Sequence, residues 1–285
     1  MEKIGFYSNQ LLGEDLKHSD IKRLLLMFDS LMLNPNSIEL IYQKEENEDL
    51  IASFDYLLNL KLLQPAKYID TIFHSEEEEL LRTELYRVGE ILNFSEDENI
   101  NLYHYHDDLH ARLDALRLAK QSGKDIIPIL KTRMGMENPI NRHSVLNFAL
   151  QKMPMPSLNT PWEQIIDFKT DKDAKSKYMA LINWVNTTAS QKKTIHEIND
   201  EFEYLYDQYA KSFKLHKITT NLTYLEMFVF AGIDVLSSFE VFNGIFLLKK
   251  LFTIKKTQIS LVTEEMKLPG KEVAYIYKAN TTFGN

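Results

Sequence analysis

The strongest constraint on the fold of this chain is a change of sequence pattern around two prolines, Pro154 and Pro156. Before them, apolar runs of strand length alternate with amphipathic stretches of helical length, whereas the segments after them repeat apolar residues at helical spacing. Alternating strands and helices build α/β or α+β folds. The sequence therefore predicts an α+β (or α/β) fold, with a mixed region at 1–155 and a mainly helical region at 156–285 that ends in a strand. The two regions are also compatible with one continuous domain.

Three apolar runs before the prolines are predicted to be strands. Leu24–Phe28 has the length of a buried strand, although a short buried helix also fits it. The run at 124–130 is short and apolar, and the run at 144–154 alternates two sets of side chains. A terminal strand is expected at 269–280, after a Pro-Gly turn, where it could pair with an N-terminal strand.

Four segments are predicted to be helices from the spacing of their apolar residues, at 46–65, 74–94, 173–189 and 194–217. Ser75 can cap the second helix, and the acidic run after it suits the positive end of the helix dipole. A capping box with proline at the first helical position, Thr160-Pro161-Trp162-Glu163, opens the helical region.

The helix at 194–217 carries a seam close to three heptads long, formed by Ile195, Ile198, Phe202, Leu205, Tyr209 and Phe213. A partner helix lies just upstream, so the seam favours a long antiparallel helical hairpin with 173–189, and a homodimer seam is the alternative. The apolar stretch at 224–252 contains three acidic residues, which leave pieces too short for a membrane helix. We expect two buried core helices there, and no membrane partner.

Composition excludes several classes of site. The chain has no cysteine, so any metal must be held by His, Asp or Glu. Its net charge of −8, from 41 acidic and 33 basic residues, opposes binding to nucleic acid, so no nucleic-acid partner is expected. The first residues lack the apolar core of a signal peptide, so a cytoplasmic location is expected.

The segment "LYHYHDDLHARLDALR" at 102–117 is the main candidate site, because it holds three of the eight histidines. If a helix begins at Tyr105 or earlier, His106, His110 and Asp114 stand one turn apart, as ligands or catalytic groups on one face would. If Asp107 or Asp108 caps the helix instead, the alignment is lost.

The capping interpretation is favoured over a metal site, because it explains both aspartates and leaves an ordinary pair of Asp108 with Arg112. A metal site needs a further ligand. The candidates in the sequence are His74, His143, Asp29 and Glu137.

Two acid-x-Lys triplets, Asp167-Phe168-Lys169 and Glu265-Met266-Lys267, match half of a metal-dependent nuclease site. Such triplets are frequent by chance in a charged chain. Neither a phosphate loop nor a nucleophile elbow is present in the sequence.

Several segments resemble landmarks of a loosely related group of bacterial proteins of unknown function, each of about this length. They are "RLLLMFDSLML", "HDDLHARLDALRLA", "PMPSLNTPWEQIIDFKTDKDAKSKYMALINWV" and "PGKEVAYIYKA". The strongest is Pro-Trp-Glu-x-Ile-x-x-Phe-Lys-x-Asp at 161–171. The resemblance covers most of the chain and implies no reaction, cofactor or catalytic residue. Some members of the group lie near mobile or antiphage gene islands, which implies an accessory or antiviral setting.

The absence of a convergent catalytic motif, together with local sets of tyrosines, favours protein contacts over catalysis. The sequence predicts a cytoplasmic bacterial interaction protein, such as a sensor, adaptor or regulatory subunit, with no cofactor and no activity of its own. Its expected partner is another protein or a second copy of the chain. The alternative is a metal-dependent hydrolase, nuclease-like or phosphohydrolase-like, that uses the His/Asp cluster at 104–114 and a divalent metal.

Overall fold

The computed structural model describes residues 2–8, 18–35, 38–39, 42, 48–67, 75–94, 100–130, 141–237 and 265–284. The chain falls into two compact units. The first comprises Met1–Lys169 together with Ala279–Asn285, and the second comprises Thr170–Lys278. The predicted fold class is confirmed, since a small parallel sheet lies in the N-terminal part and the C-terminal half is mostly helical.

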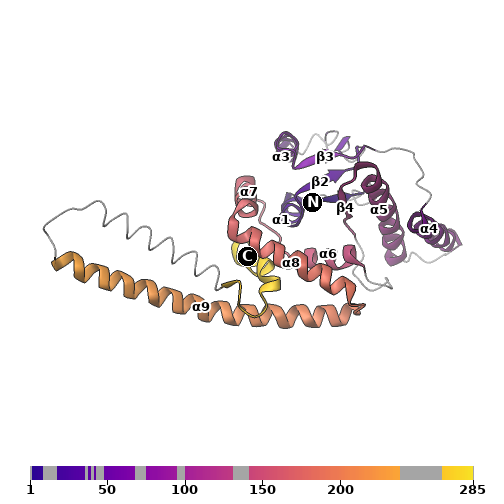
Figure 1. Cartoon of the computed structure of the whole chain (residues 1–285). Helices are drawn as coiled ribbons and strands as arrows, with labels where there is room; N and C mark the ends of the chain where they lie inside the picture. Colours follow the sequence, from indigo (N-terminus) through magenta and orange to yellow (C-terminus); the bar gives the residue numbers. More distant parts are fainter. Residues whose placement is uncertain are drawn as a thin grey trace. The chain divides into compact units, whose positions relative to one another are not determined.

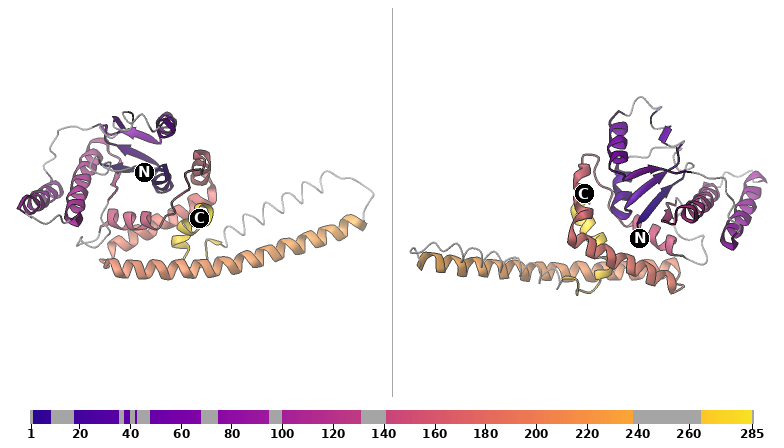
Figure 2. Two further views of the ribbon diagram at one scale, coloured as in Figure 1. Left: turned by 180° about the vertical axis from the view of Figure 1, so that it is seen from behind. Right: turned by 45° about the horizontal axis from the view of Figure 1, so that its top comes forward.

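The sheet of the first unit contains four parallel strands in the order β3-β2-β1-β4. They are β1 (Lys3–Tyr7), β2 (Ser30–Leu33), β3 (Leu63–Pro65) and β4 (Asp125–Pro128). Helices cover both faces, as parallel sheets require. In Figures 1 and 2, α1 (His18–Met27) and α3 (Glu48–Asn59) lie on one side and α5 (Ile100–Ser122) on the other. Helix α4 (Glu76–Phe94) packs on the outside of α5.

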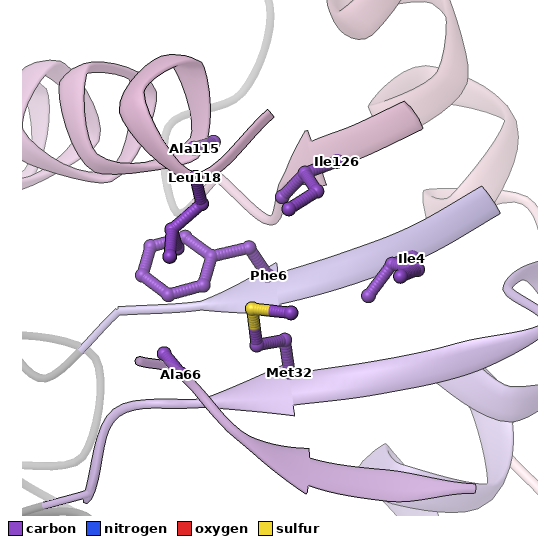
Figure 3. Packing of buried hydrophobic residues seen from close by; sticks show 7 residues of the cluster. All are labelled: Ile4, Phe6, Met32, Ala66, Ala115, Leu118 and Ile126. Atoms are coloured by element: carbon purple, nitrogen blue, oxygen red, sulfur yellow. The ribbon is translucent and has the colours of Figure 1, made fainter. Parts of the chain in front are cut away.

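The two faces of β1 are packed differently. On one face, Phe6 and Ile126 meet Ala115 and Leu118 of α5, in a cluster completed by Ile4, Met32 and Ala66 (Figure 3). On the other face, a Cβ atom added to Gly5 would lie 2.6 Å from the Phe28 ring. Glycine at this position therefore lets the end of α1 close against the strand.

Two of the runs predicted to be strands are helices. Leu24–Phe28 lies mainly in α1, and 144–154 lies mainly in α6 (Arg142–Gln151), whose N-cap Asn141 accepts a hydrogen bond from the Ser144 amide. Leu24 to Phe28 and Ser144 to Leu150 are buried without interruption. A helix that is buried all round shows no apolar stripe, so periodicity cannot distinguish it from a strand.

The strands that the structure contains were harder to predict from the sequence. The N-terminal strand β1 was not anticipated, and β2 begins just after the apolar run that had suggested a strand. The strand expected at 124–130 is confirmed as β4.

The prediction of a terminal strand at 269–280 is also wrong. This segment forms the short helix η2 (Lys271–Val273) and α11 (Ala274–Phe283). Ile276, Ala279 and Phe283 are buried at helical spacing, and this burial outweighs the preference of Tyr and Ile for strands.

The predicted hairpin of the second unit is confirmed, although α9 is longer than expected. Helix α8 (Lys172–Ser190) is followed after a short turn by α9 (Ile195–Ser237), which runs back in the opposite direction (Figure 1). Trp184 of α8 lies beside Phe202 of α9, with ring centroids 6.1 Å apart. The apolar stretch at 224–252 continues α9 as far as Ser237, and its remainder lies outside the described residues. Among the described helices, none is both long and apolar enough to cross a bilayer.

Candidate functional site on helix α5

Helix α5 begins at Ile100, before Tyr105, and this start aligns the candidate residues. His106, His110 and Asp114 therefore occupy successive turns of one helix face. The two imidazole rings meet edge to face, with centroids 4.8 Å apart. Asp107 and Asp108 lie inside the helix, so the expectation that one of them caps it is wrong.

Asp108 and Arg112, which the sequence suggested as an ordinary pair, lie one turn apart on α5. Asp108 is 1% exposed. Burial lowers the pKa of Arg112, and the Asp108 carboxylate opposes that change.

The histidine face of α5 packs against α4. Gly89 of α4 lies beside the His106 ring, since a Cβ atom added to it would lie 3.7 Å from His106 Nε2, an ordinary contact distance. Near the other end of the two helices, Glu78 of α4 accepts hydrogen bonds of 3.0 and 2.8 Å from Arg117 of α5. The face is thus the contact surface of two helices.

Burial in this contact shifts two titrating groups in opposite directions. It raises the pKa of Asp114 to about 6, and the positive charge of Arg117 only partly offsets the effect. Burial, and then the neighbouring His106, lower the pKa of His110. Both shifts favour the neutral side chain, as expected where apolar residues exclude water.

The candidate further ligands do not complete a metal site in the described part of the chain. There, no group of three or more His, Asp or Glu side chains is arranged to hold a metal ion. His143 lies near Arg142, Asp125 and Arg112, and Asp29 accepts a hydrogen bond from the Lys3 amide. His74 and Glu137 lie outside the described residues. A metal ion needs three or four ligands that converge on one point, whereas His106, His110 and Asp114 follow one another along two turns of a single helix.

The strongest resemblance motif, residues 161–171, connects elements of the first unit. Helix α7 (Trp162–Thr170) begins with Trp162, whose indole N–H donates to Ser53 of α3 at 3.1 Å. The ammonium of Lys22 lies 5.0 Å from the Trp162 ring centroid. Glu163 accepts a hydrogen bond from the Tyr56 hydroxyl at 3.0 Å. Trp162 and Glu163 therefore both have hydrogen-bond partners on α3.

Lys169 belongs to the same motif, and its ammonium donates to the Phe28 carbonyl just after α1. Burial lowers the pKa of Lys169 to about 8, and Asp29 opposes the change. This lysine therefore caps a helix. Asp167, the acid of its triplet, is exposed.

The second triplet contributes to a buried charge cluster in the second unit, which the sequence did not reveal. Lys177, with a side chain 3% exposed, pairs with Asp173 at 2.5 Å and Glu265 at 2.7 Å. Glu265 also accepts a hydrogen bond from Tyr209, and Lys278 pairs with Asp173 at 2.9 Å. The one sequence signal was the four-residue spacing of Asp173 and Lys177. The remaining partners are brought in by the tertiary fold.

Comparisons with protein families, curated proteins and solved structures find no match to this chain.

Proposed function

We propose that the protein is an interaction protein, acting as a sensor, adaptor or regulatory subunit, and that α9 is its binding element through which two copies associate. The observation that carries this proposal is the length of α9. It has 43 residues, and at a rise of about 1.5 Å per residue it is about 65 Å long. In Figure 1 its C-terminal part runs past α8 and α11.

The first part of α9 anchors the helix in its own unit. Ile198, Phe202 and Tyr209 are buried. The ring centroids of Phe213 and Tyr277 are 5.4 Å apart. On another face of the same part, Tyr204 and Leu215 are 64% and 67% exposed. These two residues are about three helical turns apart, so they share one side of the helix.

The second part of α9 has the sequence of an associating helix. Aliphatic residues recur at steps of three or four along it, at Ile218, Leu222, Leu225, Val229, Ile233 and Leu236. Such a repeat is typical of helices that pair along an apolar seam. A second copy of the chain supplies a matching repeat, which supports a homo-oligomer.

The test measures the mass of the full chain in solution by light scattering after size exclusion. We expect the wild-type protein at twice its chain mass of 33.4 kDa. Leu225→Arg with Val229→Arg should give a monomer of unchanged helix content. The matched control, Thr220→Arg with Thr223→Arg, changes the opposite side of the helix and should stay dimeric. A wild-type monomer at every concentration, or equal effects of the two pairs, would contradict the proposal.

A metal-dependent hydrolase is kept as a second candidate, because α5 begins early enough to align His106, His110 and Asp114. This proposal predicts a bound divalent metal, measured by elemental analysis of purified protein. His106→Ala or His110→Ala should lose the metal without a change in the circular dichroism spectrum. Protein that stays metal-free after incubation with zinc would rule this candidate out.

A further inference from the structure

The first part of α9 carries a continuous strip of exposed side chains, which we call the outer strip. Tyr204 and Leu215 are 64% and 67% exposed, and between them the side chains of Asp207 and Lys211 are 53% and 69% exposed. These four positions follow one another at steps of three or four residues, so they lie on one side of the helix. Tyr209, which is buried in the second unit, lies on the opposite side.

The outer strip is in line with the aliphatic repeat of the second part of α9. The helix continues to Ser237, and successive residues turn by about 100° around its axis. Ile218 follows Leu215 by three residues, and Leu222 follows it by seven, so the repeat begins on the side where the strip ends. Strip and repeat together make one face from Tyr204 to Leu236, about 48 Å long.

Two copies of the chain can pair along this face in two symmetric ways. In a parallel pair the two-fold axis runs along the helices, so each residue lies level with the same residue of the other copy. In an antiparallel pair the axis is perpendicular to the helices, so each residue away from the axis lies level with a different one. Charges on the face therefore distinguish the two arrangements.

The charges of the first part oppose the parallel pair. Lys211 lies within the outer strip, so two copies of this lysine would meet in the contact. Its ion pair with Asp207, at 2.6 Å, is exposed and compensates such a contact only weakly. Asp200 and Glu203 are exposed in the turns just before, and each would also lie level with its own copy. Like charges in register disfavour an arrangement of helices.

An antiparallel pair separates these like charges. When the face overlaps along its whole length, Tyr204 lies level with Leu236 of the other copy, and Lys211 lies level with Val229. The apolar stem of a lysine can cover an aliphatic side chain while its ammonium stays in water. The acidic turns of the two copies then lie at opposite ends of the contact.

We propose that two copies of the chain pair in antiparallel orientation along α9, so that the first part of each helix binds the second part of the other. This inference rests on the proposed function, because it needs two copies that associate through α9. It adds the orientation of the pair, and it places the outer strip in the contact.

The test measures distances between spin labels in the full-length dimer by pulsed electron paramagnetic resonance. The chain has no cysteine, so Asp200→Cys and Lys214→Cys each provide one attachment point, both at exposed positions of α9. In the antiparallel pair we expect the two labels to lie about 60 Å apart at position 200 and about 18 Å apart at position 214. In a parallel pair the two positions should differ by less than about 10 Å, because the helices cross at only about 20°.

The difference between the two distances is the decisive quantity. It is about 42 Å for any antiparallel pair centred beyond Lys214, so it does not depend on the exact register. The mass of each labelled variant is first measured by light scattering, and an excess of unlabelled wild-type chain should remove the signal between labels.

The outcomes separate this inference from the proposed function. A dimer in which both variants give similar distances would overturn the antiparallel orientation and leave self-association through α9 in place. A monomer would overturn the proposed function, and this inference with it. A dimer whose distances differ by about 42 Å, with the longer one at position 200, would support both.

Discussion

At the scale of single residues, Asp114 is a group whose burial should make the stability of the protein depend on pH. It lies on the face of α5 that packs against α4, and burial raises its pKa to about 6. The folded state therefore holds this proton more tightly than the unfolded chain does. The resulting stabilisation is complete below the ordinary carboxyl pKa and is lost as pH rises through about 6.

Asp114→Asn should remove this dependence, because asparagine keeps the size and polarity of the protonated acid. We expect the variant to exceed the wild type in free energy of unfolding by about 2 kcal/mol at pH 7, and to match it near pH 4. Urea unfolding between pH 4 and 8 measures the difference. A constant difference across that range would show that Asp114 is ionised in the folded protein.

At the scale of secondary-structure elements, the attachment of η2 to α9 depends on Gly270. This residue has a φ of +78°, and a Cβ atom added to it would lie 2.0 Å from the Leu205 carbonyl oxygen. Backbone conformation and close approach both require glycine here. The segment after it also packs on α8, where the Tyr275 and Tyr178 ring centroids are 5.2 Å apart.

Gly270→Ala should destabilise the protein by more than the backbone conformation alone explains. The control is Gly123→Ala, where φ is +66° and no atom lies within 4 Å of an added Cβ. We expect about 1–2 kcal/mol for the control, from its left-handed backbone. The additional clash at Gly270 should make Gly270→Ala lose clearly more free energy of unfolding than Gly123→Ala does, as measured by thermal or urea unfolding. Equal losses would show that the backbone of η2 moves away freely.

Two helices of the first unit, α3 and α4, lie in segments that the sequence predicted to be helical. The helix expected at 74–94 is α4, whereas the one expected at 46–65 is α3 only as far as Asn59, and its last residues form strand β3. The Ser75 hydroxyl accepts a hydrogen bond from the Glu78 amide at 3.3 Å, as a cap should. The sequence failed where an element is buried on every side, as in α6.

At the scale of the whole molecule, each unit is held together by partners that are distant in sequence. In the second unit, Lys177 joins Asp173 on its own helix to Glu265, which is also bonded to Tyr209 of α9. Removing one member of a buried ion pair leaves the other charge without compensation, which typically costs 3–5 kcal/mol.

Lys177→Met should therefore reduce the free energy of unfolding by about 3 kcal/mol. Adding Glu265→Gln to it removes the charge left without its lysine, so the double variant should recover part of the loss. Chemical unfolding of the wild type, the single variant and the double variant gives the comparison. A double variant less stable than the single one would show that Tyr209, and not Lys177, is the main partner of Glu265.

The sequence alone determined the fold class, the amphipathic helices and the residues that would share a face if α5 began early, because these follow from local spacing. Only the tertiary structure decided that α5 does begin at Ile100, that α6 and α11 are helices, and that β1 lies beside both β2 and β4. It also decided which charges meet, as in the pairing of Glu78 with Arg117. The reason is physical: burial on all sides removes the periodic signal, and contacts between distant residues leave no pattern in a local window.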